Sequence, residues 1–164
     1  MLRILNPRFV PTVQICLLLI WLLSAPVYQA KDQDQSGAVS RSELILAVNT
    51  LRVSYGLPAL IEDPIVNAVA QSTAEIMAAN NMSWHIGDVR GRIAAAGYGG
   101  GATVWATENF LVGKMSIDEI MQAWADPDHM RPAVNPAYCH VGAGVAQAPD
   151  GEYYYILQAA YTSE

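Results

Sequence analysis

The chain has 164 residues, 52% of them apolar, and carries a formal net charge of −6. A chain of this length typically forms one domain and can bury a hydrophobic core. The acidic balance disfavours nucleic acid and anionic membrane surfaces as partners, because both are negatively charged.

The first 30 residues have the features of a secretory signal peptide. Arg3 and Arg8 precede an uninterrupted apolar run at residues 15–23, and small residues up to Ala30 offer a cleavage site. The alternative is an uncleaved membrane anchor, but the run is shorter than the roughly 20 residues that span a bilayer. We therefore predict a secreted protein with no stable membrane insertion after cleavage. Without the two arginines, 7 Lys and Arg residues would face 15 Asp and Glu residues, a net charge of −8.

Residues 31–43 form an acidic segment with the ligand spacing of an EF-hand calcium loop. Gly37 stands at the sixth position, where such a loop turns sharply. The oxygen ligands would come from positions 1, 3, 5, 7, 9 and 12, which are Asp32, Asp34, Ser36, Ala38, Ser40 and Glu43. The alternative is a solvated acidic linker. We predict that this loop binds Ca²⁺ with the weak affinity of extracellular sites.

Helical periodicity follows this segment. The first predicted helix starts near Glu43, buries the face that carries Leu44 and Arg52, and ends at Gly56-Leu57-Pro58. The second starts at Asp63-Pro64, an N-cap followed by proline at the first helical position, and ends at residues 80–81. Its predicted inner face consists of Ile65, Val69, Ser72, Ile76 and Ala79.

The rest of the chain mixes loops, a helix and strands. Residues 82–104 are predicted to be mostly loop, with a short helix at 89–96. A capping box at residues 116–119 opens a further helix, which ends at Asp126-Pro127. Residues 141–147 and 153–161 are predicted strands, joined by a hairpin turn at Asp150-Gly151. Because strands and helices do not alternate, we predict an α+β fold with helices packed on a small antiparallel sheet.

Two further predictions concern single side-chain types. Cys16 lies in the signal segment and Cys139 is alone in the mature domain, so no internal disulfide can form. We predict that Cys139 is a buried small apolar residue. Along residues 153–161 the side chains fall on two faces by period two, and one face is predicted to lie in the core and the other beneath a helix. The first face carries Tyr153, Tyr155, Leu157 and Tyr161, and the second carries Tyr154, Ile156 and Gln158. A ligand groove is the alternative for that second face.

Three residues in the second half carry the chemistry that the sequence offers. The chain has three histidines, and His85 and His129 flank Glu108, which stands in an uncharged run. Two imidazoles that converge can bind Zn²⁺, and a carboxylate can orient a ligand histidine. The alternatives are a polar network that only holds loops in place, and hydrolytic chemistry in the same cleft.

The ordered set of motifs resembles the secreted bacterial branch of the CAP superfamily, also called SCP-like. The resemblance covers roughly residues 43–162, nearly all of the mature chain, and implies a CAP-like domain at residues 44–164. It rests on Asn49 and Arg52 before Gly56-Leu57-Pro58, on Asp63-Pro64, on Glu108-Asn109, on Ala123-Trp124, and on residues 141–145. The resemblance implies an α-β-α sandwich with a cleft that holds two histidines and two acidic residues. On this basis His85, Glu108 and His129 would line the cleft.

The sequence departs from the family pattern at this cleft. Thr107 stands where the family has glycine, and Pro127 occupies the second acidic position. Asp126 or Asp128 would have to replace the missing carboxylate. We therefore predict an extracellular binding module for a lipid, glycan or protein ligand. The alternative is a metal-assisted hydrolase that acts on peptide or cell-wall material through the cleft.

Overall fold

A computed structural model describes residues 38–163 of the chain. The predicted signal peptide lies outside the described residues, as do Asp32, Asp34, Ser36 and Gly37 of the predicted calcium loop. None of the helices within residues 38–163 combines the length and apolar character that crossing a membrane requires.

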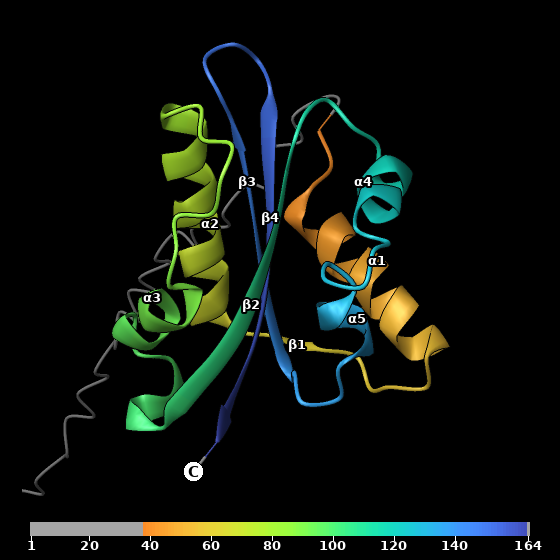
Figure 1. Cartoon of the computed structure of the whole chain (residues 1–164), viewed down its shortest axis with the longest axis vertical. Coiled ribbons are helices and arrows are strands. Elements are labelled where there is room, and N and C mark those ends of the chain that lie inside the picture. Colours follow the sequence, from red (N-terminus) through yellow and green to blue (C-terminus); the bar gives the residue numbers. More distant parts are fainter. Residues whose placement is uncertain (1–37, 164) are drawn as a thin grey trace, which may run out of the picture. The chain divides into compact units, whose positions relative to one another are not determined.

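The described residues form an α+β fold around one mixed sheet. In chain order the elements are α1 (Arg41–Ser54), β1 (Ile61–Glu62), α2 (Pro64–Ala79), α3 (Val89–Ala95), the 3-10 turn η1 (Tyr98–Gly101), β2 (Thr103–Val112), α4 (Ile117–Ala123), α5 (Arg131–Val134), β3 (His140–Gln147) and β4 (Tyr153–Ser163). The strand order is β1-β3-β4-β2. Helices α2 and α3 cover one face of the sheet, and α1, α4 and α5 cover the other (Figure 1). The predicted α-β-α sandwich is confirmed, with one parallel pair, β1–β3, beside the antiparallel pairs.

The predicted helix starts are confirmed because they depend on local hydrogen bonds, whereas α4 ends at Ala123, before the predicted Asp126-Pro127. Asp63 caps α2 by accepting from the backbone of Ile65 at 2.8 Å. The capping box before α4 pairs Ser116 with Glu119 through both a side-chain and a backbone bond. The short helix predicted at residues 89–96 is α3. Each cap satisfies backbone N–H groups that the first turn of a helix leaves without partners.

Strand β4 is the central element of the core. All its residues from 153 to 160 are buried. Tyr155 and Leu157 pack among the residues under α1 and α4, whereas Tyr154 and Ile156 pack under α2. The prediction that both faces of this strand are covered is confirmed, which explains why its sequence is apolar without interruption except at Gln158.

Helix α2 packs so closely on β3 that glycine is required in the strand. A Cβ atom at Gly142 would overlap backbone atoms of Val66, and one at Gly144 would overlap backbone atoms of Ala70. The buried face of α2 consists of Val66, Ala70, Thr73, Ala74, Met77 and Ala78. The predicted inner face was therefore wrong by one residue, and Ile76 is 46% exposed. Close approach selects small side chains at the contact, whereas the prediction had favoured large ones.

Buried Arg52 fixes the segment that follows α4 to helix α1. Its guanidinium donates to the carbonyl oxygens of Pro58, Pro132, Asn135 and Tyr138 at 2.6 to 3.0 Å. Four acceptors satisfy a cation that is fully buried, which would otherwise be costly. This anchor matters for the site, because the same segment carries His129.

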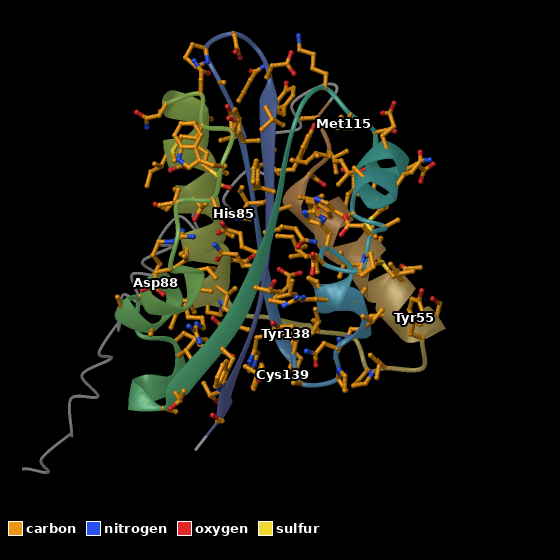
Figure 2. The ribbon with its side chains drawn as sticks, viewed as in Figure 1. Tyr55, His85, Asp88, Met115, Tyr138 and Cys139 are labelled. Atoms are coloured by element: carbon orange, nitrogen blue, oxygen red, sulfur yellow. The ribbon has the colours of Figure 1, made fainter. Side chains whose placement is uncertain are left out.

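Two further features of the fold were not predicted correctly. Strand β2 pairs with β4 along its whole length, from Thr103 opposite Ser163 to Val112 opposite Tyr154. Its polar residues at 107–109 interrupt the alternation that indicates a strand, so no sequence pattern predicted this strand. Cys139 is exposed rather than buried, because it lies just before β3 begins (Figure 2).

Candidate functional site

A polar cavity of about 220 Å³ opens at strand β2, which forms one edge of the four-stranded sheet. Its lining comes from three segments: the loop between α2 and α3, strand β2, and the segment after α4. The lining residues are His85, Thr107, Glu108, Asn109, Asp128, His129 and Arg131. The structure thus brings His85, Glu108 and His129 to one cavity although 44 positions separate the two histidines.

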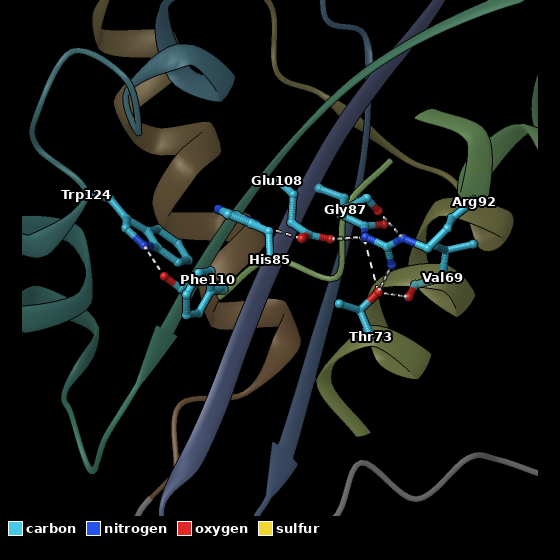
Figure 3. A network of polar contacts seen from close by, with 9 residues as sticks. Val69, Thr73, His85, Gly87, Arg92, Glu108, Phe110 and Trp124 are labelled. Carbon is cyan, nitrogen blue, oxygen red and sulfur yellow. Dashed lines mark hydrogen bonds and ion pairs between the residues drawn. The ribbon is translucent and has the colours of Figure 1, made fainter. Parts of the chain in front are cut away.

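Glu108 is the buried centre of a hydrogen-bond network on the α2 side of β2. Its side chain is only 3% exposed. One carboxylate oxygen accepts from Nδ1 of His85 at 2.9 Å, and the other accepts from Arg92 at 2.8 Å and from Gln158 at 2.7 Å (Figure 3). Since a carboxylate only accepts, Nδ1 of His85 carries the hydrogen. The network fixes both the tautomer and the direction of the imidazole ring.

Opposing effects act on the pKa of Glu108, and the lowering effects win. Burial raises the pKa because it disfavours the charged form, whereas the hydrogen bonds from His85, Gln158 and Arg92 and the positive charge of Arg92 lower it. The net result is a pKa below the ordinary glutamate value. Glu108 is therefore ionised at neutral pH, and its oxygens are already engaged by three side chains. A carboxylate in this state orients its neighbours and is poorly suited to remove a proton from a substrate.

Arg92 connects this network to helix α2. Its guanidinium also donates to the carbonyl oxygen of Gly87 at 3.1 Å and to the hydroxyl of Thr73. The Thr73 hydroxyl in turn donates to the carbonyl oxygen of Val69 at 2.7 Å (Figure 3). The ring of His85 packs edge-on against Phe110, with ring centroids 4.8 Å apart. The loop that carries His85 is thus held from two helices and one strand.

Sequence reasoning missed Arg92, Gln158 and Thr73. The signal for Gln158 was available, because a single amide inside an apolar strand must find a buried polar partner. Arg92 had no such signal, since an arginine in a short helix usually faces solvent. The register of β2 against β4 places Glu108 opposite Gln158, on the face of the sheet that α2 and α3 cover. This register reveals that the carboxylate needs a donor from α3, the helix that carries Arg92.

The second histidine belongs to a different kind of pair on the other side of β2. Nδ1 of His129 contacts a carboxylate oxygen of Asp126, and the two side chains are 40% and 46% exposed. The other oxygen of Asp126 accepts from the backbone N–H groups of Asp128 at 2.9 Å and His129 at 3.2 Å. These bonds, led by the imidazole contact, lower the pKa of Asp126. Asn109 donates to the carbonyl oxygen of His129 at 2.7 Å and joins the segment to the strand.

The remaining predicted carboxylate is not part of this pair. Asp128 lines the cavity and pairs with Arg131 at 2.9 Å, and both side chains are exposed. Asp126 therefore supplies the carboxylate beside His129 that Pro127 cannot supply.

Metal binding at either predicted location stays a prediction. Within residues 38–163, no group of three or more His, Cys, Asp or Glu side chains is placed to hold a metal ion. His85 and His129 line the same cavity, but each directs its Nδ1 to a carboxylate of its own. Of the calcium loop, Ala38, Ser40 and Glu43 are described, and Ser40 and Glu43 form the capping box of α1. The carboxylate of Glu43 accepts from the backbone of Ser40 at 2.7 Å, so a calcium ion would compete with this cap.

Comparison with known proteins supports the family that the motifs indicate. The family model described as CAP, the cysteine-rich secretory protein family, matches residues 45–159. The chain belongs to this family. No curated protein matches the chain by sequence.

Solved structures share the fold of this CAP domain at low identity. An outer surface protein from Borrelia burgdorferi is 19% identical with a TM-score of 0.65, over 74% of this chain and 92% of that one. A cysteine-rich secretory protein from Staphylococcus aureus is 18% identical with a TM-score of 0.59, over 73% of this chain but 37% of that one. An extracellular protein from Bacillus anthracis that contains an SCP domain is 22% identical with a TM-score of 0.55, over 71% and 39% of the two chains.

Proposed function

We propose that this CAP domain is an extracellular binding module that takes a polar ligand in the cavity between His85 and His129. The extracellular location is supported by the signal-like residues 1–30 and by structural neighbours that are described as a surface, a secretory and an extracellular protein. The single observation that favours binding over catalysis is that the Glu108 carboxylate has no free oxygen with which to act as a base. This carboxylate is ionised, buried and engaged by His85, Arg92 and Gln158.

The lining of the cavity favours a polar ligand over a lipid. Hydroxyl, amide, imidazole, carboxylate and guanidinium groups all face it, from Thr107, Asn109, His129, Asp128 and Arg131. The neighbouring apolar cavity under α1 and α4 holds only about 10 Å³. That volume accommodates roughly one water molecule, whereas an acyl chain needs far more.

A metal-assisted hydrolase that acts on peptide or cell-wall substrates is the second candidate. One observation favours it: Asp126 contacts the imidazole of His129, as the orienting carboxylate does in a general-base pair. Against it, Glu108 has no free oxygen to activate water. The hydrolase would therefore need His129 as its general base. It would also need a metal ion that His85 and His129 bind together.

One experiment separates binding from hydrolysis. The full-length protein, labelled with ¹⁵N, is mixed in turn with soluble oligosaccharides, peptides and short-chain lipids, and the mixtures are analysed by mass spectrometry after incubation. We expect amide shifts at Thr107, Asp128 and His129 with at least one class, and no products. Asp128→Asn should weaken the binding, whereas Asp118→Asn, an exposed carboxylate on α4, should not. Products that disappear in the His85→Ala, His129→Ala double variant would establish the hydrolase instead, and silent cavity amides would refute binding.

We also propose that the acidic loop binds Ca²⁺ and stabilises the N-terminus of α1. The support is the ligand spacing of residues 32–43, whose last ligand, Glu43, lies in the first turn of α1. We expect Ca²⁺ to raise the melting temperature by a few degrees relative to chelator, because an ion that binds only the folded state stabilises it. The shift should vanish in Asp32→Asn, Asp34→Asn. These positions are preferable to Glu43, whose loss would also remove the helix cap. A shift that survives in this variant would contradict the proposal.

A further inference from the structure

Trp105 combines solvent exposure with an unusually fixed position. It is 41% exposed. Its indole N–H donates to the hydroxyl of Ser163 at 3.1 Å, and its ring stacks on Tyr161, with centroids 6.2 Å apart and an interplanar angle of 14°. The guanidinium of Arg90, from α3, lies 5.3 Å from the ring centroid. The polar atom of the indole is thus satisfied internally, while the residue as a whole stays 41% exposed.

The ring of Trp105 is preorganised for binding, because its position is already fixed before a ligand arrives. An exposed aromatic side chain usually loses rotamer freedom when a ligand immobilises it, and that loss weakens binding. Trp105 is already held by a cross-strand neighbour, a hydrogen bond and a cation, so this cost is largely absent. Rigid exposed aromatic rings are the typical anchors of binding surfaces.

The aromatic ring lies beside the polar cavity. Trp105, Thr107 and Asn109 alternate along β2, so their side chains share one face of the strand. Tyr138 adjoins this area: its ring meets that of Tyr161 edge-on, with centroids 5.5 Å apart. Tyr138 lies next to β2 at the end of the sheet where β3 begins (Figure 2). We call Trp105 and Tyr161 the aromatic platform, and the buried ring of Tyr138 packs against it. The aromatic platform borders the cavity at Thr107.

An apolar plane next to a set of hydrogen-bonding side chains matches the chemistry of a sugar. A pyranose ring presents C–H groups on its faces and hydroxyl groups around its rim. The aromatic platform would take a face, and the hydroxyl of Thr107 and the charged groups of Asp128 and Arg131 would take the rim. Two residues along a strand advance by about 7 Å, so a ligand that reaches from Trp105 into the cavity needs more than one ring.

Charge narrows the class of sugar further. The mature domain would carry a net charge of −8, from 7 Lys and Arg against 15 Asp and Glu after the loss of Arg3 and Arg8. Sulfated and uronic saccharides are therefore disfavoured. We propose that the ligand is an uncharged pyranose oligosaccharide, which packs one ring against the exposed part of Trp105 and extends the next into the cavity. This inference rests on the binding role proposed above.

The test is a titration of the full-length protein with maltotetraose and with the tetramer of N-acetylglucosamine, followed by NMR. We expect at least one of these probes to shift both the indole N–H signal of Trp105 and the amide signal of Thr107. Trp105→Ala should weaken the affinity at least tenfold, and Trp105→Phe should restore part of it. Trp84→Ala is the matched control, since Trp84 is 62% exposed and lies outside the platform. Thermal melting establishes that each variant is folded, and Trp105→Phe provides the comparison if the alanine variant is not.

The outcomes separate this inference from the proposed function. Binding by neither probe, or binding that Trp105→Ala leaves unchanged, overturns the oligosaccharide inference. If peptides then shift the cavity amides while the Trp105 signal stays silent, the binding role stands and only the ligand class is wrong. If a probe shifts Trp105 while Thr107, Asp128 and His129 stay silent, the cavity is not the site and the proposed function fails.

Discussion

The two histidines that line the cavity meet their carboxylates in opposite ways. His85 bonds to Glu108, whose side chain is 3% exposed and which also holds Arg92 and Gln158, residues far apart in the sequence. His129 bonds to Asp126, three positions away, and both side chains are largely open to solvent. A histidine–carboxylate pair thus stabilises the fold on one side of β2, whereas the pair on the other side stays open to solvent. This difference is why we assign structure to the Glu108 side and ligand contact to the His129 side.

Removal of Arg92 should have the largest effect on stability. Arg92→Leu would leave the buried Glu108 carboxylate without its cation, and we expect a loss of about 3 kcal/mol in the free energy of unfolding. Urea denaturation measures it. Arg90→Leu, on the same helix, is the matched control and should cost only about 0.5–1 kcal/mol, the value of an exposed cation–π contact. Equal losses in the two variants would show that Glu108 does not depend on Arg92.

The second-largest expected effect is a loss of stability at acidic pH, caused by protonation of Glu108. The folded pKa of Glu108 is lowered, so its contribution is complete above the unfolded value, near 4.3, and is lost as the pH falls through the lower folded value. Glu108→Gln should therefore lose less stability than the wild type as the pH falls below about 4.3. Urea midpoints across this range measure the slope, with Asp118→Asn as the control. A variant slope as steep as that of the wild type would place the acid sensitivity elsewhere.

The exposed pair of Asp126 and His129 should contribute least to the stability of the fold. Asp126→Ala removes a local contact between two solvated groups, and such pairs add little to stability. We expect the urea midpoint to move by less than about a third of the shift that Arg92→Leu produces. A comparable shift would mean that the Asp126 side is as structural as the Glu108 side, and the comparison drawn above would fail.

Sequence patterns predicted the features of the fold that depend on interactions between residues close together in the chain. The caps at Asp63 and Ser116, the end of α1 near Gly56 and the buried face with Leu44 and Arg52 all depend on residues within a few positions of one another. The family motifs also placed His85 and Glu108 in one cleft, which their long separation in sequence would not reveal.

The sequence did not predict features that depend on close packing between distant segments. The inner face of α2 is set by Gly142 and Gly144, which admit the helix backbone, and not by the largest apolar residues of the helix. The role of Arg92 depends on where β2 places Glu108, and β2 itself shows no clean alternation. No pattern in the sequence distinguishes Trp105, because its three contacts come from β4 and α3.

The most direct test of the account is a pH titration of the Glu108 carboxyl carbon by ¹³C NMR in the full-length protein. If Glu108 is the ionised anchor of the network and not a catalytic base, its pKa lies below the ordinary glutamate value of about 4.3. The signal should then show one transition at low pH, and no change between pH 5 and 8. A transition near neutral pH, where a working general base titrates, would contradict the account and favour the hydrolase.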